Sequence, residues 1–329
     1  MSETTTRSWR WGTNRWMVLL LIILSAVFAG IFPPLRPHVQ LPAELLTDPL
    51  FTLPLIGDFQ LSNTLVALLL ADLILIGMAL LVSRAVRGGE LTLGGLAAAV
   101  EGLVEGLYTL TESTAGKWAK TIFPWMATIV LLVLIVNWTE LIPGVDSIGL
   151  LDQHHIENPE ACTFDTLFRL GSTEVVAVGG ESECAAGVVP FVRVASTDLN
   201  FTIGLAIISV VVTQFIGLRA QGRAYLGKFF NTQTLFKTPM FGAINFLVGL
   251  LEAILESVKV LSFSFRLFGN IFAGSILLFV VGSLVPIFAQ SAVLLFEFFV
   301  GMIQAIVFGM LTLIFMSLAT VGHAEAEAH

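Results

Sequence analysis

Four ionisable residues lie within one long apolar stretch of the sequence, residues 240–285. A charged side chain at the centre of a bilayer costs at least about 2.5 kcal/mol, so residues of this kind mark functional sites. At 100° per residue, a helix places these charges and two polar neighbours along a single stripe. The stripe consists of Glu252, Glu256, Lys259, Ser262, Arg266 and Asn270. Its first and fifth members are separated by about 21 Å of helix axis.

Two interpretations of this stripe differ in how they treat Arg266. Glu252 or Glu256 can pair with Lys259 at helical spacing, so a structural ladder of ion pairs explains the first three charges. No acidic residue lies three or four positions from Arg266, and a guanidinium cannot lose its proton to escape burial. Arg266 therefore needs a carboxylate from elsewhere, on this chain or on a partner, which favours a functional role.

The last apolar stretch, residues 286–320, carries a second polar pair, Glu297 and Gln304. Two helical turns place the two side chains about 20° apart and about 10 Å apart along the axis. A carboxyl and an amide on one intramembrane face suit a proton or cation path, because both exchange hydrogen bonds with water. A satisfied pair in the protein core is an equally good interpretation of the spacing alone.

The composition requires a membrane to surround these residues. Of the 329 residues, 56% are hydrophobic and 12% are charged, whereas soluble domains average about 25% charged residues. Six apolar stretches reach the roughly 20 residues that a membrane helix needs, namely residues 16–34, 61–82, 122–141, 201–218, 240–285 and 286–320. The sequence therefore predicts an all-α polytopic membrane protein with about six transmembrane helices, of which the last two are long and tilted, bent or partly interfacial.

The segments between the spans indicate how the chain is oriented. In residues 91–120, apolar residues recur at three- and four-residue spacing opposite three glutamates, which predicts one amphipathic helix on the membrane surface. The expected apolar face consists of Leu96, Val100, Leu103, Leu107 and Leu110, and the opposite face of Glu101, Glu105 and Glu112. Eleven of the 16 Lys and Arg residues fall on one side of the membrane, which predicts that both termini are cytoplasmic if the first span is retained. The sequence shows no transit peptide, which favours a bacterial plasma membrane. The first stretch is an extra span or, alternatively, a signal peptide cleaved after Val27-Phe28-Ala29. The net charge of −8 argues against a nucleic-acid partner.

The outer loop, about residues 143–197, holds both cysteines of the chain, Cys162 and Cys184. A disulfide between them fits that compartment. His154 and His155 match no zinc-ligand spacing, so no metal site and no cofactor are expected. We divide the chain into residues 1–60, an extra span with an outer segment, and residues 61–329, a core into which the outer loop is inserted.

The segment Ser264–Gly274 reads SFRLFGNIFAG and resembles the arginine motif of subunit a of F-type ATP synthases, the stator of the membrane-embedded proton motor. Further stretches resemble this family in the same order, namely NWTELIPG at 137–144, STDLN at 196–200, residues 217–230, and Gln304-Ala305. The resemblance covers about residues 60–320 and implies that the last two apolar stretches form a tilted helical hairpin.

The resemblance assigns roles residue by residue. Arg266 matches the essential arginine, with Asn270 as its polar neighbour, Gln304 as the last-helix glutamine and Glu252 as the acid near the cytoplasmic exit. Glu297 matches the outer-channel proton relay. The secondary residues of this expectation are Glu256, Lys259, Ser262 and Ser275, the last in a position where many members have an ionisable group, together with Asp198 in the STDLN motif.

The implied function is proton translocation through two half-channels that Arg266 separates, coupled to ATP synthesis by a rotating ring of c subunits. The implied partners are the c-ring, the peripheral stalk subunit b, other ATP synthase subunits, protons and the lipid bilayer, with no ATP chemistry on this chain. Two alternatives remain at this point: the same motor driven by sodium, or a stand-alone ion channel or transporter. The latter would need its own counter-charge for Arg266 and usually shows internal repeats.

Overall fold

A computed structural model describes residues 11–31, 43–47, 51–53, 57–87, 95–142, 145, 148–152, 162–170, 173–180, 187–227, 239–284 and 288–321. The chain divides into two compact units. The larger unit comprises residues 40–146, 191–272 and 298–329, and the smaller comprises residues 1–39, 147–190 and 273–297. Each unit is described by itself.

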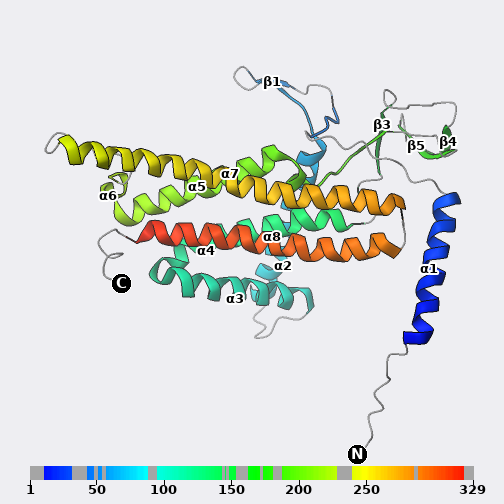
Figure 1. Cartoon of the computed structure of the whole chain (residues 1–329), viewed down its shortest axis with the longest axis horizontal. Coiled ribbons are helices and arrows are strands. Elements are labelled where there is room, and N and C mark those ends of the chain that lie inside the picture. Colours follow the sequence, from blue (N-terminus) through cyan, green and yellow to red (C-terminus); the bar gives the residue numbers. More distant parts are fainter. Residues whose placement is uncertain are drawn as a thin grey trace, which may run out of the picture. The chain divides into compact units, whose positions relative to one another are not determined.

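Helices make up the spans (Figure 1). They are α1 (Trp11–Ile31), α2 (Asn63–Arg87), α3 (Gly95–Ala115), α4 (Ala119–Trp138), α5 (Leu199–Gln221), α6 (Arg223–Leu226), α7 (Pro239–Leu284) and α8 (Phe288–Thr320). The strands are β1 (Phe51–Leu53), β2 (Gly57–Phe59), β3 (Gly149–Asp152), β4 (Cys162–Leu170), β5 (Thr173–Gly180) and β6 (Gly187–Pro190).

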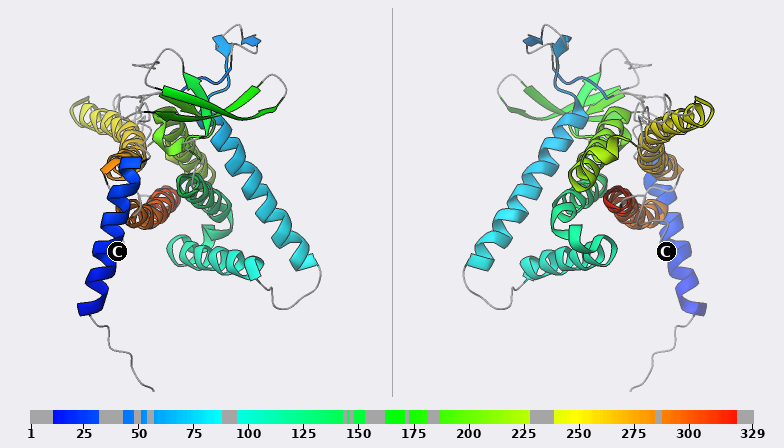
Figure 2. Two further views of the ribbon diagram at one scale, coloured as in Figure 1. Left: turned by 90° about the vertical axis from the view of Figure 1, so that its right-hand side faces the viewer. Right: turned by 90° about the vertical axis from the view of Figure 1, so that its left-hand side faces the viewer.

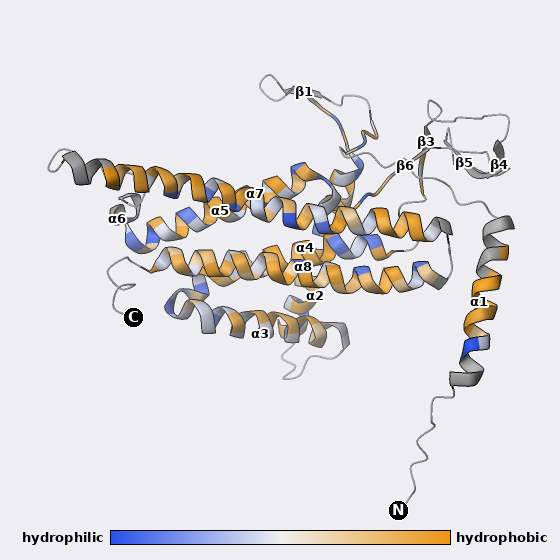
Figure 3. Cartoon of the chain, viewed as in Figure 1, coloured by the Kyte–Doolittle hydropathy of each residue, from blue (hydrophilic) through white to orange (hydrophobic). Residues whose placement is uncertain are grey.

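Five helical segments are long and apolar enough to cross a membrane, which confirms the predicted all-α membrane fold. They cover 63–84, 97–141, 199–221, 246–282 and 289–320, and their apolar character is evident in Figure 3. The sixth expected span corresponds to α1, whose apolar segment among the described side chains, Arg15–Leu24, is too short to be one of the five. The segment at 97–141 includes α3, so length and composition alone do not separate this helix from the span that follows it.

Helix α3 is amphipathic, but the face that it buries differs from the expected one. Its glutamates at 101, 105 and 112 are exposed and Leu107 is buried, as the periodicity predicts. Leu103, however, is 39% exposed, while Thr111 is fully buried. Contact with α4 rotates the buried stripe toward small residues. The Thr111 hydroxyl tolerates burial because it donates to the Leu107 carbonyl oxygen at 2.7 Å.

The core of the larger unit gathers side chains from α2, α4, α5, α7 and α8. Within this unit α2 runs crosswise to α3, α4 and α5 (Figures 1 and 2). Phe263, Leu267 and Ile271 recur every four residues on α7 and are all buried, so they form the face that packs inward. At Gly309 on α8, an added Cβ would overlap the Val130 side chain of α4, so the absence of a side chain allows these helices to approach closely.

Polar side chains join the helices of the larger unit at one end. Asp198 caps α5 by accepting from the Asn200 backbone N–H at 2.9 Å, and it also accepts from the Thr64 hydroxyl of α2 at 3.0 Å. Asn137 on α4 donates to the Gly301 carbonyl of α8 at 3.1 Å and accepts from the Ser196 hydroxyl at 2.6 Å. These bonds satisfy buried polar groups and hold α2, α4, α5 and α8 in register.

The smaller unit contains two antiparallel strand pairs, β3 with β6 and β4 with β5. The expected outer loop thus folds partly into strands, which the all-α description of the spans did not include. Cys162 begins β4, whereas Cys184 lies outside the described residues, as do His154 and His155. The predicted disulfide therefore also lies outside the described part of the structure.

The end of α7 and the start of α8 also belong to the smaller unit, where they lie against each other. A Cβ added to Gly282 would come within 3.3 Å of the Gln290 side chain, and one added to Gly274 would overlap the carboxyl group of Glu297. Phe263 of α7 contacts Phe308 and Phe315 of α8 in the larger unit. In each unit, α7 and α8 therefore pack as an antiparallel pair of long helices.

Candidate functional site

Arg266 lies on the outward face of α7. Its neighbours Phe263, Ser264 and Leu267 are buried in the core, which turns the guanidinium side of the helix away from the other helices. The Ser264 hydroxyl on the inward face is bonded to the backbone carbonyl oxygens of Thr202 and Val260. Arg266, Asn270 and Ser262 are all exposed, which places the arginine end of the predicted stripe on one outer surface of α7.

Within the part of the chain that the structure describes, Arg266 has neither a hydrogen bond nor an ion pair. The helix around it is apolar enough to cross a membrane, and the exposed side chains beside it include Phe265 and Leu261. A permanent charge in that environment requires a counter-charge. The described residues supply no such group to Arg266, so the counter-charge has to come from elsewhere, on this chain or on a partner.

Lys259 behaves differently, because its charge is neutralised within the chain. Its ammonium nitrogen lies 2.9 Å from a carboxylate oxygen of Glu256, one turn earlier on α7. The same nitrogen stands 4.6 Å above the Phe315 ring of α8. The structure therefore contains the pairing of Glu256 with Lys259, one of the two that the spacing allowed.

Glu297 is buried in the smaller unit at 4% exposure. Neither carboxyl oxygen has a hydrogen-bond partner among the described residues. The group lies against Gly274 of α7, where any side chain would occupy the same space. A buried carboxyl group without a bonding partner is costly, so such a group is retained for a reason other than stability. This environment suits a residue that takes up and releases a proton.

The other predicted residues fall in distinct environments. Gln304 and Ser275 are half-buried on α8 and α7, and Glu252 is half-buried near the start of the charged stripe. Asp198 is 7% exposed and serves as the helix cap described above, so its position is explained structurally. The roles of these residues in proton transfer stay predictions.

Three residues near these groups were not assigned a role from the sequence. Gly274 stands inside the arginine motif, but its contact with Glu297 joins positions 23 residues apart. Gln214 and Tyr225 form a hydrogen bond across a turn, on the side of α5 that faces Glu256. No periodic pattern connects such positions, and only the folded chain brings them together.

Comparison with known proteins supports the resemblance. The family model described as ATP synthase A chain matches residues 64–317. The ATP synthase subunit a of a Shewanella species is 32% identical over 238 residues, which cover 70% of this chain and 72% of the relative. That of Psychromonas ingrahamii is 29% identical over 235 residues, covering 70% of this chain and 74% of the relative.

The family match spans the helices that carry Arg266 and Gln304. With the five apolar helices, the matches support a multi-pass protein of the bacterial inner membrane whose partners are other ATP synthase subunits. They confirm the family suggested by the sequence motifs. The chain therefore belongs to the ATP synthase subunit a family, the stator subunits of the Fo membrane sector of F-type ATP synthases.

Proposed function

We propose that this chain conducts protons between two half-channels, with Arg266 as the fixed charge that separates them and faces the rotating c-ring. The observation that carries the proposal is the exposure of Arg266 on a membrane helix without an ionic partner among the described residues. An acidic group on a neighbouring ring subunit would supply the missing counter-charge. Because the ring turns, this pairing would form and break with each subunit that passes.

The other polar residues then divide between the two half-channels. Protons enter from the outer side past Glu297, Gln304 and Asn270 and neutralise a ring carboxylate, which can then move into lipid. After rotation, the ring group releases its proton toward the cytoplasm past Glu252 and Glu256. The membrane potential supplies about 2.3 kcal/mol per charge per 100 mV, so several protons are needed for each ATP.

The proposal extends to topology and partners. Cytoplasmic termini follow from the distribution of Lys and Arg, and this orientation places the Glu252 end of α7 toward the cytoplasm. The c-ring would cover the Arg266 face, and the peripheral stalk subunit b would hold the chain against the rotating ring. The proposed cargo is the proton rather than the sodium ion. A metal cation needs several oxygen ligands, whereas the buried Glu297 carboxyl group has no hydrogen-bond partner among the described residues.

The test is reconstitution of the whole complex with Arg266→Ala in proteoliposomes, with ATP-driven proton pumping recorded by a pH-sensitive dye. We expect pumping to fall to background while the complex assembles and ATP hydrolysis continues. Arg219→Ala is the matched control, because Arg219 is an exposed arginine in the last turn of α5 and its removal deletes the same charge. Pumping by Arg266→Ala at the rate of this control would exclude the barrier role.

The ion is tested in the same vesicles. A proton motor keeps pumping in sodium-free buffer, and its rate does not rise when sodium is added. Pumping that requires sodium would instead support the sodium-driven alternative.

A further inference from the structure

A pocket of about 370 Å³ opens between α5, α6 and α7 in the larger unit. Its polar lining comes from Gln214 of α5, Tyr225 of α6 and Glu256 of α7, and the rest is apolar, with Ala253 on the α7 side. Glu256 lies ten residues before Arg266, or about 15 Å along the helix axis. The pocket is therefore displaced from Arg266 toward the end of α7 that the proposed orientation places in the cytoplasm.

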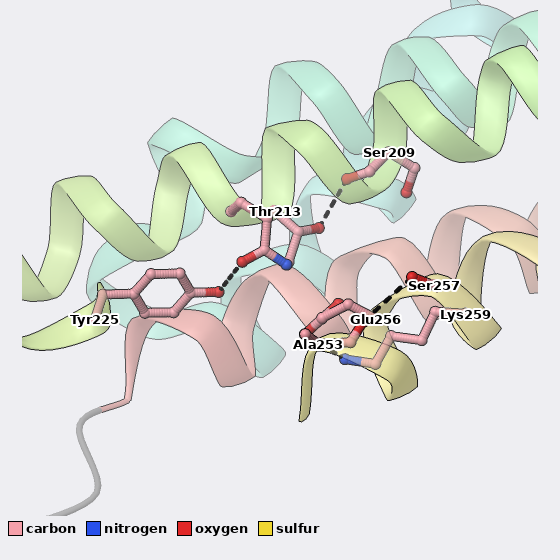
Figure 4. Close-up of polar contacts among 8 residues, drawn as sticks. Ser209, Thr213, Tyr225, Ala253, Glu256, Ser257 and Lys259 are labelled. Carbon is pink, nitrogen blue, oxygen red and sulfur yellow. Dashed lines mark hydrogen bonds and ion pairs between the residues drawn. The ribbon is translucent and has the colours of Figure 1, made fainter. Parts of the chain in front are cut away.

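The turn after α5 positions Tyr225 in this pocket. Gly222 has a φ of +63°, a left-handed conformation that ends α5 and turns the chain into α6. Tyr225 is consequently folded back and only 4% exposed. Its ring occupies space that a side chain at position 217 would fill, so Gly217 is required for this packing. Figure 4 shows the Tyr225 side chain together with Glu256, Ala253 and Lys259 on α7, and Tyr225, Ala253 and Glu256 line the pocket.

Tyr225 determines how the Gln214 amide is oriented. The phenol O–H donates to Gln214 Oε1 at 2.6 Å. Burial, with smaller contributions from Glu256 and Glu252, raises the pKa of Tyr225 to about 12, so the phenol keeps its proton at neutral pH. Because the amide oxygen accepts this bond, the amide nitrogen is the group left to donate.

The Gln214 amide nitrogen is buried and has no hydrogen-bond partner in the described structure. A buried donor of this kind calls for an acceptor close by. Water meets the requirement, because the pocket far exceeds the 10–15 Å³ that one water needs and supplies an amide donor, a phenol oxygen and a carboxylate. The Glu256 carboxylate is already paired with Lys259 at 2.9 Å, so the Gln214 amide is the group that decides between water and lipid. A lipid chain would fill the apolar part of the pocket but would leave this amide unsatisfied.

We infer that this pocket is the hydrated exit of the cytoplasmic half-channel, in which Gln214, oriented by Tyr225, holds the water that links Glu256 to the path. A proton released by a ring carboxylic acid passes along water to the Glu256 carboxylate, which then returns it to cytoplasmic water. The inference rests on the proposed function. Gln214 and Tyr225 are positioning residues, and Glu256 is the group that carries the proton.

Hydration is tested by cysteine accessibility in inverted membrane vesicles that contain the whole complex. Ala253→Cys places a thiol in the pocket, and Leu255→Cys places one on another side of the same helix turn. A small membrane-impermeant methanethiosulfonate reagent is added to the cytoplasmic side, with Gly227→Cys after α6 as the positive control and the unmodified chain as background. We expect Ala253→Cys to react at a rate close to that of Gly227→Cys and at least about tenfold faster than Leu255→Cys, because only a thiol in contact with water ionises and reacts.

An unreactive Ala253→Cys beside a reactive Gly227→Cys would show that lipid fills the pocket and would overturn the inference. Reaction of Ala253→Cys only from the outer side would overturn it equally. Labelling does not depend on proton transport, so selective labelling supports the hydrated pocket even in a complex whose pumping survives Arg266→Ala.

The proton-carrying role is tested by passive proton flux as a function of the pH on the cytoplasmic side. We expect Tyr225→Phe and Gln214→Leu each to lower the flux by about fivefold, the equivalent of one hydrogen bond. Glu256→Gln should lower it further and alter its dependence on cytoplasmic pH, whereas Glu256→Asp should retain more flux than Glu256→Gln. The exit assignment would be overturned if Glu256→Gln changed neither the flux nor its pH profile. If Arg266→Ala still stopped pumping in the same complex, the proposed function would nevertheless stand.

Discussion

The contact between Gly274 and Glu297 predicts a large effect from one added methyl group. In Gly274→Ala, the new Cβ would occupy the position of the Glu297 carboxyl group, so this group has to move. Overpacking of this kind costs about 1–3 kcal/mol. If the displaced carboxyl group carries protons, the same energy enters the transport barrier, and a factor of ten per 1.4 kcal/mol gives a rate about 5- to 140-fold lower.

The assay is ATP-driven proton pumping by the reconstituted complex, normalised to the amount of assembled complex. Gly77→Ala is the matched control, because it adds the same methyl group to the apolar helix α2, where a Cβ meets nothing within 4 Å. Both substitutions gain up to about 1 kcal/mol of helix propensity, so their comparison isolates the effect of overpacking. We expect the control to pump normally.

A second variant tests the cause of the loss. Glu297→Asp shortens the side chain by one methylene group and withdraws the carboxyl group from position 274. The double variant Gly274→Ala with Glu297→Asp should therefore pump faster than Gly274→Ala alone. Equal pumping by Gly274→Ala and Gly77→Ala would refute the reasoning, since it would mean that the carboxyl group of Glu297 can move without consequence.

Three further effects follow from other contacts. Asn137→Leu leaves the buried Ser196 hydroxyl without its acceptor and removes the side-chain bond to the Gly301 carbonyl of α8. It should lower the free energy of unfolding by about 1–3 kcal/mol, measured as a lower thermal midpoint in detergent. In a Tyr108→Phe chain, ultraviolet titration should show that Tyr225 ionises near its raised pKa of about 12. Its stabilising contribution is therefore complete below pH 10 and is lost as the pH rises through 12, and titration near pH 10 would contradict the burial. Lys259→Gln removes both the ion pair and the ring contact and should destabilise the chain by about 1–3 kcal/mol, while Lys259→Arg should lose less.

The position and order of the membrane helices could be predicted from the sequence because lipid imposes a simple rule. A backbone in hydrocarbon has to satisfy its own hydrogen bonds, so each long apolar run becomes a helix. The exact boundaries follow from local caps, such as Asp198 before α5 and Gly222 after it. The short strands of the outer loop were not predicted, because outside the membrane water can satisfy the backbone and the local signal is weak.

The buried face of α3 shows where periodicity fails. Helical spacing correctly separated the glutamates from the leucines, but it could not predict that Leu103 would be left exposed while Thr111 became buried. That choice depends on which residues of α4 meet the helix. A polar side chain that bonds its own backbone, as Thr111 does, enters a core at little cost.

The sequence by itself determined that Arg266 lacks a counter-charge on its own helix, because i±3 and i±4 are the only positions that α7 offers. The tertiary structure decided how each charge is accommodated. Glu256 neutralises Lys259, whose ammonium group also lies over the Phe315 ring of α8, whereas Arg266 is left on the outer surface. It also brought Gly274 against the carboxyl group of Glu297 and formed the hydrogen bond between Tyr225 and Gln214. The physical reason is that helix geometry relates residues within one turn, while contacts between helices depend on packing that no single helix encodes.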